Sequence, residues 1–342
     1  MNVVVTGAGS TVALSVLNSL DHDPEIGSIL ALDIRPYHGD RSPKIRSLVA
    51  DVRDREALLA AFSSADAVIH LAFVVVTDVP DAAAVREINI EGSRRVLEAA
   101  ARTGVRKVIY TSSVAAYGAV PGNALVLTEE APCRGLENER NFYYAYTKAA
   151  VEEIMEDFSR SHPGIVVTRF RSHILVGPRV LEDSAQLRLL AGLAGPSRSF
   201  WGFRPLGPNG RQAQYTHEED LAAAILYALH HELPGAYNIA GEPLDLAAYL
   251  RGKGKTFRTI PWGPANVLAS LLSPFSARIR LAKSWLVSAR YRNIIDCSKL
   301  RRAGFDPPLR TTFECLEEVA AFEGRRRAAA AEESSRLGRD NG

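Results

Sequence analysis

The residues with the clearest chemical potential lie in two neighbouring segments of the chain. One contains the pair Ser112-Ser113, and the other contains Tyr144 with Lys148 four residues later. On a helix this spacing places the phenol and the ammonium group on one face. A free phenol has a pKa of about 10, and a fixed neighbouring cation favours its ionised form. Tyr144 is therefore predicted to exchange a proton with a substrate oxygen, and Ser113, at the end of a strand, to hydrogen-bond the same oxygen.

The composition is that of a soluble globular protein with one large domain or two closely joined ones. Of the 342 residues, 46% are hydrophobic and 23% are charged, and the net charge of +2 gives no reason to expect a nucleic-acid partner. Cys133, Cys297 and Cys315 show neither metal-ligand spacing nor a disulfide framework, so we expect no metal and a reducing, cytoplasmic compartment. Neither a signal-peptide pattern nor an apolar run long enough for a membrane span is present.

The first half of the chain alternates short β-branched segments with stretches of helical periodicity. The predicted strands cover residues 2–6, 28–33, 47–50, 67–71, 107–112 and 165–170. The predicted helices include residues 55–62, 82–102 and 143–160, and a helix over 219–231 and a strand over 236–240 follow. This alternation favours βαβ units and a parallel sheet covered on both faces.

Two further regions, residues 173–216 and 242–310, are irregular and rich in Gly, Pro and Arg. We interpret them as a smaller lobe that closes over the carboxyl edge of the sheet. Within it, residues 260–287 are apolar with scattered Lys and Arg, which fits a lipid-surface helix or a helix of the substrate lobe. Because Pro261, Pro264 and Pro274 interrupt the pattern, the second interpretation is favoured. From Arg325 onward the chain is predicted to fray or to be disordered.

The N-terminal strand runs into a tight turn of small residues, Gly7-Ala8-Gly9-Ser10, followed by a helix. In this context a glycine-rich turn indicates dinucleotide binding, because backbone N–H groups and the helix N-terminus face a pyrophosphate. Asp33 ends the second strand, where an acidic group hydrogen-bonds the adenosine ribose. A carboxylate there repels a 2′-phosphate, which favours NAD over NADP, although Arg35 weakens the preference.

Two further positions border the predicted cofactor site. Asp51 follows the third strand, where it could accept a hydrogen bond from the adenine amino group, but a turn or helix-start role is equally compatible with its place. His70-Leu71-Ala72 ends the fourth strand, where small residues let the chain pass close to the cofactor. For His70 itself a structural role is favoured.

Together these segments resemble the extended short-chain dehydrogenase/reductase superfamily, and within it the NAD-dependent epimerase/dehydratase group. A Tyr and a Lys four residues apart also occur by chance, so the order and spacing of many markers carry the resemblance. The markers are Thr6-Gly7-Ala8, Asp33, Asp51, His70-Leu71-Ala72, Asn89-Ile90-Glu91-Gly92-Ser93, Val96-Leu97-Glu98-Ala99-Ala100, Gly104-Val105-Arg106-Lys107-Val108, Tyr110-Thr111-Ser112-Ser113, Tyr144 with Lys148, Val176-Gly177-Pro178, His217-Glu218-Glu219-Asp220 and Tyr237-Asn238.

The resemblance implies an α/β fold: a Rossmann-type doubly wound parallel sheet with a smaller C-terminal substrate-binding lobe. Residues 1–172, completed by 217–241, would form the NAD-binding domain, residues 173–216 and 242–322 the lobe, and residues 323–342 a flexible tail.

The same resemblance implies catalytic Ser113, Tyr144 and Lys148, with Lys148 on the nicotinamide ribose. Ser113 is preferred over Ser112 because family members place the active hydroxyl four residues before the Tyr-Gly that Tyr117-Gly118 matches. The expected cofactor-binding residues are Gly7, Gly9, Ser10, Thr11, Val12, Asp33, Asp51, Val52, Leu71, Ala72, Tyr144 and Lys148.

The chain departs from the family pattern in its glycine turn. The family opening reads TGxxGxxG, whereas Ser10 and Ala13 stand at the second and third glycine positions. Ala13 adds only a methyl group, but Ser10 replaces the glycine that lets the backbone approach the pyrophosphate. We expect Gly9 to take this role, and the altered turn leaves a non-catalytic NAD-binding protein as one alternative.

The substrate class depends on the position three residues before Gly177. Nucleotide-sugar epimerases commonly carry Asn there, whereas this chain has Ile174, which is similar to the 3β-hydroxysteroid dehydrogenase-like branch. The favoured function is NAD-dependent hydride transfer at a secondary alcohol or ketone of a small-molecule substrate, and a homodimer is allowed. A nucleotide-sugar epimerase or dehydratase is the alternative, with phosphates held by Arg171, Arg179, Arg204 or Arg211.

Overall fold

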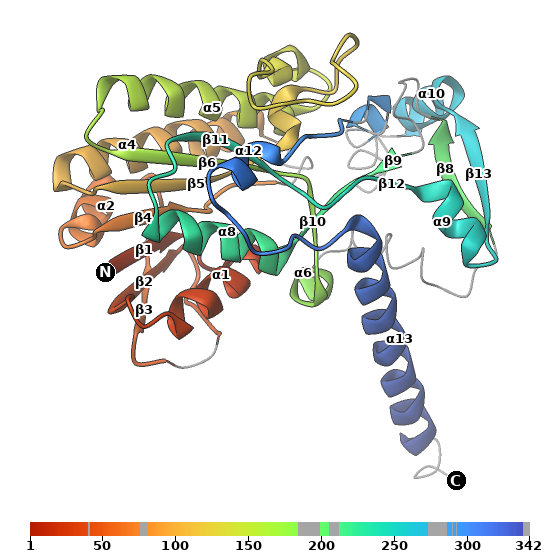
Figure 1. The fold of residues 1–342 in the computed structure, drawn as a ribbon, viewed down its shortest axis with the longest axis horizontal. Coiled ribbons are helices and arrows are strands. Elements are labelled where there is room, and N and C mark those ends of the chain that lie inside the picture. The colour runs from red at the N-terminus through yellow and green to blue at the C-terminus, as the bar shows by residue number, and fades with distance from the viewer. Residues whose placement is uncertain are drawn as a thin grey trace.

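The computed structural model describes residues 1–39, 42–75, 81–183, 199–204, 212–272, 286–288, 290–291 and 293–337. Its centre is a seven-stranded parallel sheet with helices on both faces (Figure 1). The strands follow the order β11-β6-β5-β4-β1-β2-β3. They are β1 (Asn2–Thr6), β2 (Ser28–Asp33), β3 (Ile45–Val49), β4 (Ala67–His70), β5 (Lys107–Ser113), β6 (Val166–Ser172) and β11 (Gly235–Ile239). The chain moves outward from β1 in both directions, which opens a crevice at the carboxyl ends of β1 and β4.

Each face of the sheet is covered by its own apolar layer. α1 (Thr11–His22) and α8 (Glu218–His230) pack on one face around residues such as Ile225. α2 (Arg55–Phe62), α4 (Gly92–Thr103) and α5 (Tyr143–Ser161) cover the other face around residues such as Met155. Burial on both faces explains why the strands are nearly continuous apolar runs. The Rossmann-type α/β prediction is confirmed, and the predicted strands and helices of the sheet agree with the observed ones to within one or two residues.

The helix predicted over residues 82–102 differs in detail. It consists of α3 (Ala82–Arg86), a π-helical turn (Glu87–Glu91) and α4. A π turn inserts an extra residue into the helical register, which hydrophobic periodicity does not reveal. It lies where Asn89 turns inward, and the Asn89 amide bonds the backbone N and O of Val74 at 2.7 and 3.0 Å. These two hydrogen bonds fix the position of the chain after β4, next to Phe73.

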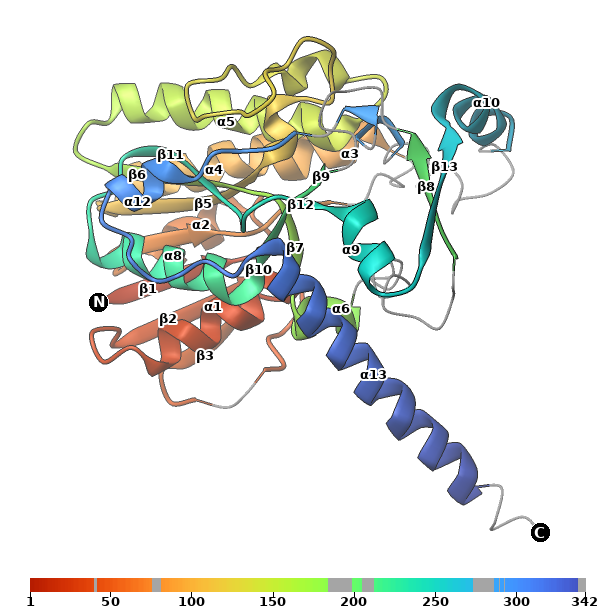
Figure 2. The same cartoon turned by 45° about the vertical axis from the view of Figure 1, so that its right-hand side comes forward.

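A smaller lobe lies beyond the carboxyl ends of the strands (Figures 1 and 2). Its strand pairs are β7 (Ile174–Val176) with β10 (Tyr215–His217), β9 (Gln212–Ala213) with β12 (Leu244–Asp245), and β8 (Ser199–Arg204) with β13 (Thr256–Pro261). Its helices include α6 (Pro178–Asp183), α9 (Leu246–Gly252) and α10 (Trp262–Leu272), after which α12 (Ser298–Arg302) returns to β11. Residues 184–198 and 205–211 of the predicted lobe lie outside the described residues.

The last helix, α13 (Thr312–Leu337), carries the chain away from the body of the molecule (Figure 2). Its first turns bury Cys315, Leu316 and Val319, whereas residues 325–330 are exposed. The sequence predicts a frayed or disordered end from Arg325, but the helix continues to Leu337, because Ala, Arg and Glu have high helix propensity. Within the described part of the chain, no helix is long and apolar enough to cross a membrane.

Candidate active site

The glycine turn connects β1 to α1 at the crevice. Gly7 has a φ of 73°, in the left-handed region that favours glycine. A Cβ at Gly7 would lie 2.4 Å from the backbone N of Ala72, and a Cβ at Gly9 would lie 3.0 Å from the Asp33 carboxylate. The turn is therefore kept free of side chains against the end of β4, which is the cradle that a pyrophosphate needs.

Ser10 is the N-cap residue of α1. It has a φ of −82° and a ψ of 153°, and its Oγ accepts a hydrogen bond from the Ala13 N–H at 3.4 Å. Any residue adopts this extended conformation, and serine is a preferred N-cap residue. Ser10 therefore introduces no backbone strain. Ala13 is fully buried. The two departures from the family pattern leave an unstrained turn and a helix N-terminus directed at the crevice.

Asp33 ends β2 and faces the glycine turn. Its Oδ2 accepts from the Gly9 N–H at 3.0 Å, and its Oδ1 accepts from the Arg35 N–H at 3.0 Å. The exposed Arg35 guanidinium donates through Nη2 to the Gly9 carbonyl at 3.3 Å, and its Nε lies 3.9 Å from Asp33 Oδ1. A carboxylate and a guanidinium thus share the place where an adenosine ribose is recognised in folds of this class.

Asp51 is held by Arg53 in the turn after β3. Arg53 donates to the carboxylate from Nε at 3.0 Å, from Nη2 at 2.7 Å and from its backbone N–H at 2.8 Å. These hydrogen bonds lower the pKa of the Asp51 carboxyl below its usual value. Asp51 therefore has a structural role in this turn, and its contact with adenine stays a prediction. Val52 is buried, and its Cγ2 would lie 2.9 Å from a Cβ at Gly92.

His70 has a structural role at the end of β4, as the sequence favours. Its Nδ1 lies 2.7 Å from Thr6 Oγ1 and its Nε2 lies 2.9 Å from Ser93 Oγ, so both ring nitrogens have partners. Burial lowers the pKa of His70 to about 3. The ring is therefore neutral near physiological pH and ties β1, β4 and α4 together.

Tyr144, in the first turn of α5, lies beside Ser113 at the end of β5. The two side chains are hydrogen-bonded, and the Tyr144 ring packs against Phe73 and Phe142 with centroids 5.9 and 6.0 Å apart. Burial raises the pKa of Tyr144 to about 12, and the hydrogen bond from Ser113 opposes this shift. The sequence predicts a lowered pKa from Lys148, but the Lys148 Nζ lies 5.9 Å from the Tyr144 ring centroid. The protein therefore holds a protonated phenol next to a serine hydroxyl.

Lys148, one helical turn beyond Tyr144, is buried. Its Nζ donates to the Thr111 carbonyl at 2.7 Å and to Tyr110 Oη at 3.1 Å. It also lies 3.6 Å from the Phe73 ring centroid, a cation–π geometry. Burial lowers the pKa of Lys148 to about 7, and the Glu152 carboxylate opposes this shift. The structure thus brings together the three side chains that the sequence predicts for catalysis.

A buried ion cluster that was not predicted from the sequence lies behind Lys148. Glu152 is 3% exposed and accepts hydrogen bonds from Arg171 Nε and Nη2, both at 3.0 Å. Arg171 Nη1 donates to Tyr117 Oη at 3.0 Å and to the Glu129 carbonyl at 3.1 Å. All three nitrogens of this guanidinium are engaged, so Arg171 is not placed to bind a phosphate. The signal was in the sequence: Glu152 follows Lys148 by four residues on the same helix face.

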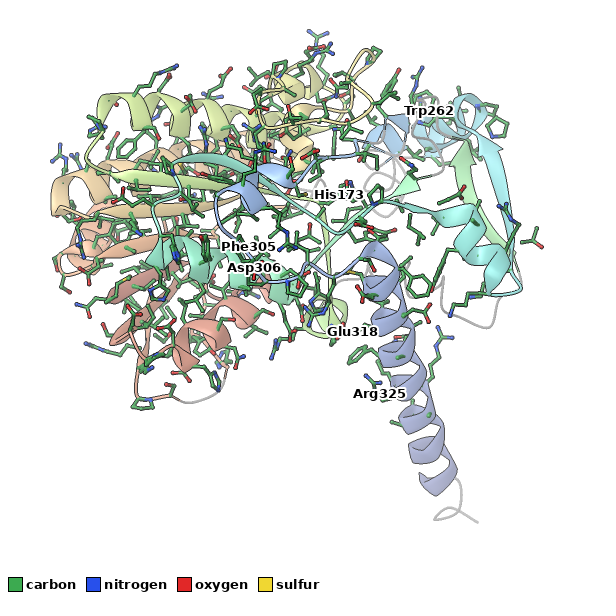
Figure 3. All side chains as sticks on the ribbon, in the orientation of Figure 1. His173, Trp262, Phe305, Asp306, Glu318 and Arg325 are labelled. Atoms are coloured by element: carbon green, nitrogen blue, oxygen red, sulfur yellow. The ribbon has the colours of Figure 1, made fainter. Side chains whose placement is uncertain are left out.

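The lobe contributes an apolar wall next to Tyr144. Val287 and Tyr291 pack with Phe142 and Tyr144. The neighbouring His173 Nε2 lies 3.1 Å from the Asn293 carbonyl, and Ile174 is 42% exposed. His173 lies where the lobe meets the sheet in Figure 3.

The remaining arginines suggested for phosphate binding are only partly described. Arg179 donates from Nη1 to Ser15 Oγ at 3.3 Å, whereas Arg211 and the side chain of Arg204 lie outside the described residues. Gly177 and Glu218 have a structural role, because the Glu218 carboxylate accepts the Val180 N–H at 2.8 Å and fills the space of a Cβ at Gly177.

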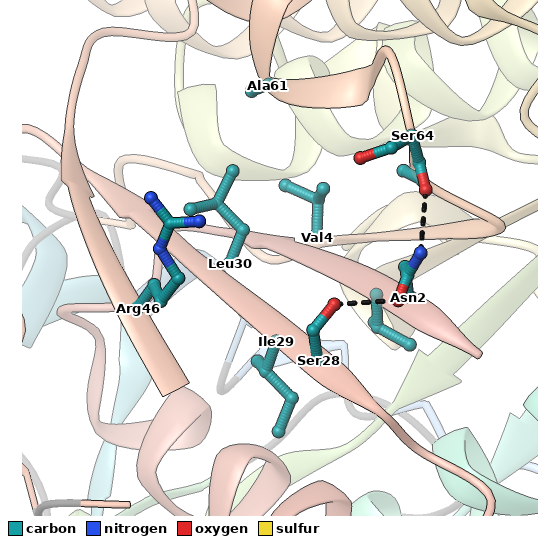
Figure 4. A pocket seen from close by; sticks show the side chains of 10 residues that line it. Asn2, Val4, Ser28, Ile29, Leu30, Arg46, Ala61 and Ser64 are labelled. Carbon is teal, nitrogen blue, oxygen red and sulfur yellow. Dashed lines mark hydrogen bonds between the residues drawn. The ribbon is translucent and has the colours of Figure 1, made fainter. Parts of the chain in front are cut away.

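A surface pocket at the opposite edge of the sheet is separate from this site. It is lined at the amino ends of β1 and β2 by residues that include Asn2, Ser28 and Arg46 (Figure 4). Ligands of open α/β sheets bind outside the carboxyl ends, so this pocket is not part of the candidate site. Among the described residues, no His, Cys, Asp and Glu side chains gather as a metal site would require.

The lowered pKa of Lys148 makes stability depend on pH. In the folded state this pKa is about 7 against a usual 10.5, so between these values the unfolded chain binds more protons. Stability from this group should therefore rise as pH rises from 7 to 10, by up to about 1.4 kcal/mol per pH unit. Unfolding in urea should show wild type gaining stability relative to Lys148→Met across this window. A pH-independent difference between the two proteins would contradict the burial of this lysine.

Comparison with known proteins identifies the family. The model of the NAD dependent epimerase/dehydratase family matches residues 3–240, so the chain belongs to this family. It is 26% identical over 337 residues to an uncharacterised protein of Mycobacterium tuberculosis, covering 94% of this chain and 84% of that one.

Two further similarities concern proteins of stated activity or ligand. The chain is 27% identical over 245 residues to N-acetyl-alpha-D-glucosaminyl-diphospho-ditrans,octacis-undecaprenol 4-epimerase of Escherichia coli O157:H7, covering 71% of this chain and 68% of that one. A short-chain dehydrogenase/reductase superfamily protein from Agrobacterium tumefaciens, solved with bound NAD, superposes with a TM-score of 0.71 at 24% identity and covers 98% of this chain and 100% of its own. That similarity supports the fold.

Proposed function

We propose that this protein uses NAD to transfer a hydride to or from the carbon of a secondary alcohol or ketone, with Tyr144 as acid/base. The observation that carries the proposal is the meeting of Ser113, protonated Tyr144 and buried Lys148 at the carboxyl edge of the sheet, beside the glycine turn. A protein that only binds NAD has no need of a phenol and an ammonium in this arrangement.

NAD is the cofactor of the family to which the chain belongs, and the residues of the crevice fit it. Gly7, Gly9 and the N-terminus of α1 would hold the pyrophosphate, with Asp33 on the adenosine ribose. When bound, the nicotinamide supplies the hydride chemistry.

The chain's own residues handle the proton. In the reducing direction Ser113 Oγ and Tyr144 Oη hydrogen-bond the substrate oxygen, and Tyr144 gives up its proton as that oxygen becomes a hydroxyl. The Lys148 ammonium then stabilises the phenolate that remains. In the oxidising direction the phenolate takes the hydroxyl proton back.

Asp33→Ala should weaken NAD binding about 10- to 100-fold, because hydrogen bonds to a charged group contribute about 1.5–3 kcal/mol. The same change should improve NADP binding relative to NAD, since Arg35 would then face the 2′-phosphate without the competing carboxylate. Calorimetric titration with both dinucleotides measures this. Tighter binding of NADP than of NAD by the wild-type protein would overturn the cofactor preference.

We further propose that the substrate carries no diphosphate, as in the 3β-hydroxysteroid dehydrogenase-like branch. The Ile174 side chain cannot donate a hydrogen bond, and Arg171 is occupied by Glu152. Val287 and Tyr291 pack near Tyr144 in an apolar cluster. A buried phosphate without donors is strongly disfavoured. The second candidate, a nucleotide-sugar epimerase or dehydratase, is supported by the family and by the 4-epimerase activity, on a diphosphate-linked sugar, that is named for the Escherichia coli relative.

A ligand panel separates the two candidates. With NAD present, UDP, dTDP and GDP sugars are compared with sterol-like and phenolic alcohols by thermal shift and by turnover. We expect stabilisation and NADH formation with members of the second group. Strong and specific stabilisation by one nucleotide sugar would replace the dehydrogenase proposal by the epimerase one, and NAD binding without any turnover would favour the non-catalytic alternative.

A further inference from the structure

The lobe carries an apolar surface that the proposed reaction does not use. On α10 the side chains of Val267, Leu268, Leu271 and Leu272 are 59%, 58%, 65% and 41% exposed. At 3.6 residues per turn these four positions fall within an arc of about 140°. Surface helices normally direct their polar side outward, whereas the outward side of α10 is aliphatic.

The inner side of the same helix is attached to the lobe. Trp262, at its start, donates from Nε1 to the Leu286 carbonyl at 2.9 Å. Pro261 ends β13 and Pro264 lies in the first turn of α10, where a proline costs no helical hydrogen bond. Of the three prolines that argue against a surface helix in the sequence, Pro261 and Pro264 therefore leave α10 intact, and Pro274 lies outside the described residues. Figure 3 shows Trp262 at the outer end of the molecule.

The charge of this part of the chain is strongly one-sided. Residues 246–295 contain nine of the 41 Lys and Arg residues and none of the 39 Asp and Glu residues. The rest of the chain holds 32 basic and 39 acidic residues, so the stretch of sequence that contains α10 is strongly basic. Among the described basic residues, Arg251 is exposed near the end of α9, and Lys253, the C-cap of α9, pairs with Glu317 at 2.7 Å. The Arg290 guanidinium lies 4.2 Å from the ring of Trp262, at the start of α10.

We propose that α10 docks the lobe onto the surface of a membrane that contains anionic lipids. Four large aliphatic side chains on one arc can enter the boundary between headgroups and acyl chains, as interfacial helices do. The Lys and Arg residues of the same stretch of sequence are attracted by the negative surface potential. The helix lies on the membrane and does not cross it, in keeping with its length of 11 residues.

The charge distribution favours this occupant over two others. A second copy of the chain joined through α10 would bring two basic regions together, and like charges across an interface are disfavoured. A nucleic acid would satisfy the basic charge but binds chiefly through phosphate contacts, which leaves the aliphatic arc exposed.

Vesicle co-sedimentation tests the proposal. The full chain is mixed with vesicles of phosphatidylcholine alone or of phosphatidylcholine with phosphatidylglycerol, at low and high salt. We expect binding to the anionic vesicles at low salt, weaker binding at high salt, and little binding to the neutral ones. Val267→Asp/Leu271→Asp should reduce the binding at least about tenfold.

Leu125→Asp/Val126→Asp is the matched control, because these side chains are 55% and 50% exposed outside the lobe. It should bind as wild type does, and the melting temperature of each variant reports its folding. Absence of wild-type binding, equal binding to neutral vesicles, or a folded α10 variant that binds like the control would overturn the proposal. So would a dimer, seen by analytical ultracentrifugation, that the α10 variant abolishes while vesicle binding is absent.

Discussion

Tyr144→Phe is expected to lower turnover by about 10²–10⁴-fold while leaving the melting temperature and the affinity for NAD nearly unchanged. The substitution removes one oxygen and keeps the ring, which packs against Phe73 and Phe142. Only the proton transfer to the substrate oxygen, and the hydrogen bond with Ser113, are lost. Steady-state kinetics and calorimetric titration with NAD measure the two effects separately.

Tyr143 and Tyr146 provide matched controls on the same helix. Tyr143 Oη donates to the Ala82 carbonyl at 3.2 Å, and Tyr146 Oη lies 3.4 Å from Arg86 Nη1. Neither phenol is placed beside Ser113, so Tyr143→Phe and Tyr146→Phe should retain most of the activity. Full activity in Tyr144→Phe, or an equal loss in one of the controls, would show that the acid/base lies elsewhere.

Glu152→Gln is expected to destabilise the fold by roughly 3–5 kcal/mol, because it leaves a buried guanidinium without its counter-charge. Arg171 loses a carboxylate bound through two hydrogen bonds of 3.0 Å, and Arg169, whose Nε lies 3.5 Å from the same carboxylate, loses part of its charge pairing. Because the Glu152 carboxylate also raises the pKa of Lys148, the variant should hold less of this lysine protonated at neutral pH.

Glu156→Gln is the matched control for the loss of stability expected in Glu152→Gln. Glu156 lies one turn further along α5, pairs with Arg169 at 2.5 Å and is 48% exposed, so its loss should cost less than about 1 kcal/mol. Urea unfolding of both variants measures the difference. Equal stabilities would contradict a structural role for the Glu152–Arg171 pair.

The central sheet could be predicted from the sequence because its signals are local. Apolar β-branched runs, helical periodicity and the small-residue turn after β1 each lie within a few residues, and their alternation defines a parallel sheet. The tyrosine and lysine of the candidate site could also be found, because a spacing of four residues on one helix places both side chains on the same face. The π-helical turn at Glu87–Glu91 escaped prediction because it shifts the register without breaking the apolar pattern.

The electrostatics of the site depended on contacts distant in sequence. The pairing of Glu152 with Arg171 and the placement of Lys148 near Phe73 come from β4, α5 and β6 meeting in space. The sequence therefore predicted a lowered tyrosine pKa from one neighbouring charge, whereas burial raises the pKa of Tyr144 to about 12. The Arg171 hypothesis failed for the same reason, since its partner lies on another element.

Transfer of deuterium tests the proposed hydride chemistry most directly. The alcohol that the panel identifies is prepared with deuterium on its carbinol carbon and incubated with the protein and NAD. Mass spectrometry of the nicotinamide then follows the label. We expect deuterium to appear on the nicotinamide with the wild-type protein and to appear more slowly with Tyr144→Phe. Loss of the label to solvent, or its transfer at an equal rate in the variant, would contradict hydride transfer assisted by Tyr144.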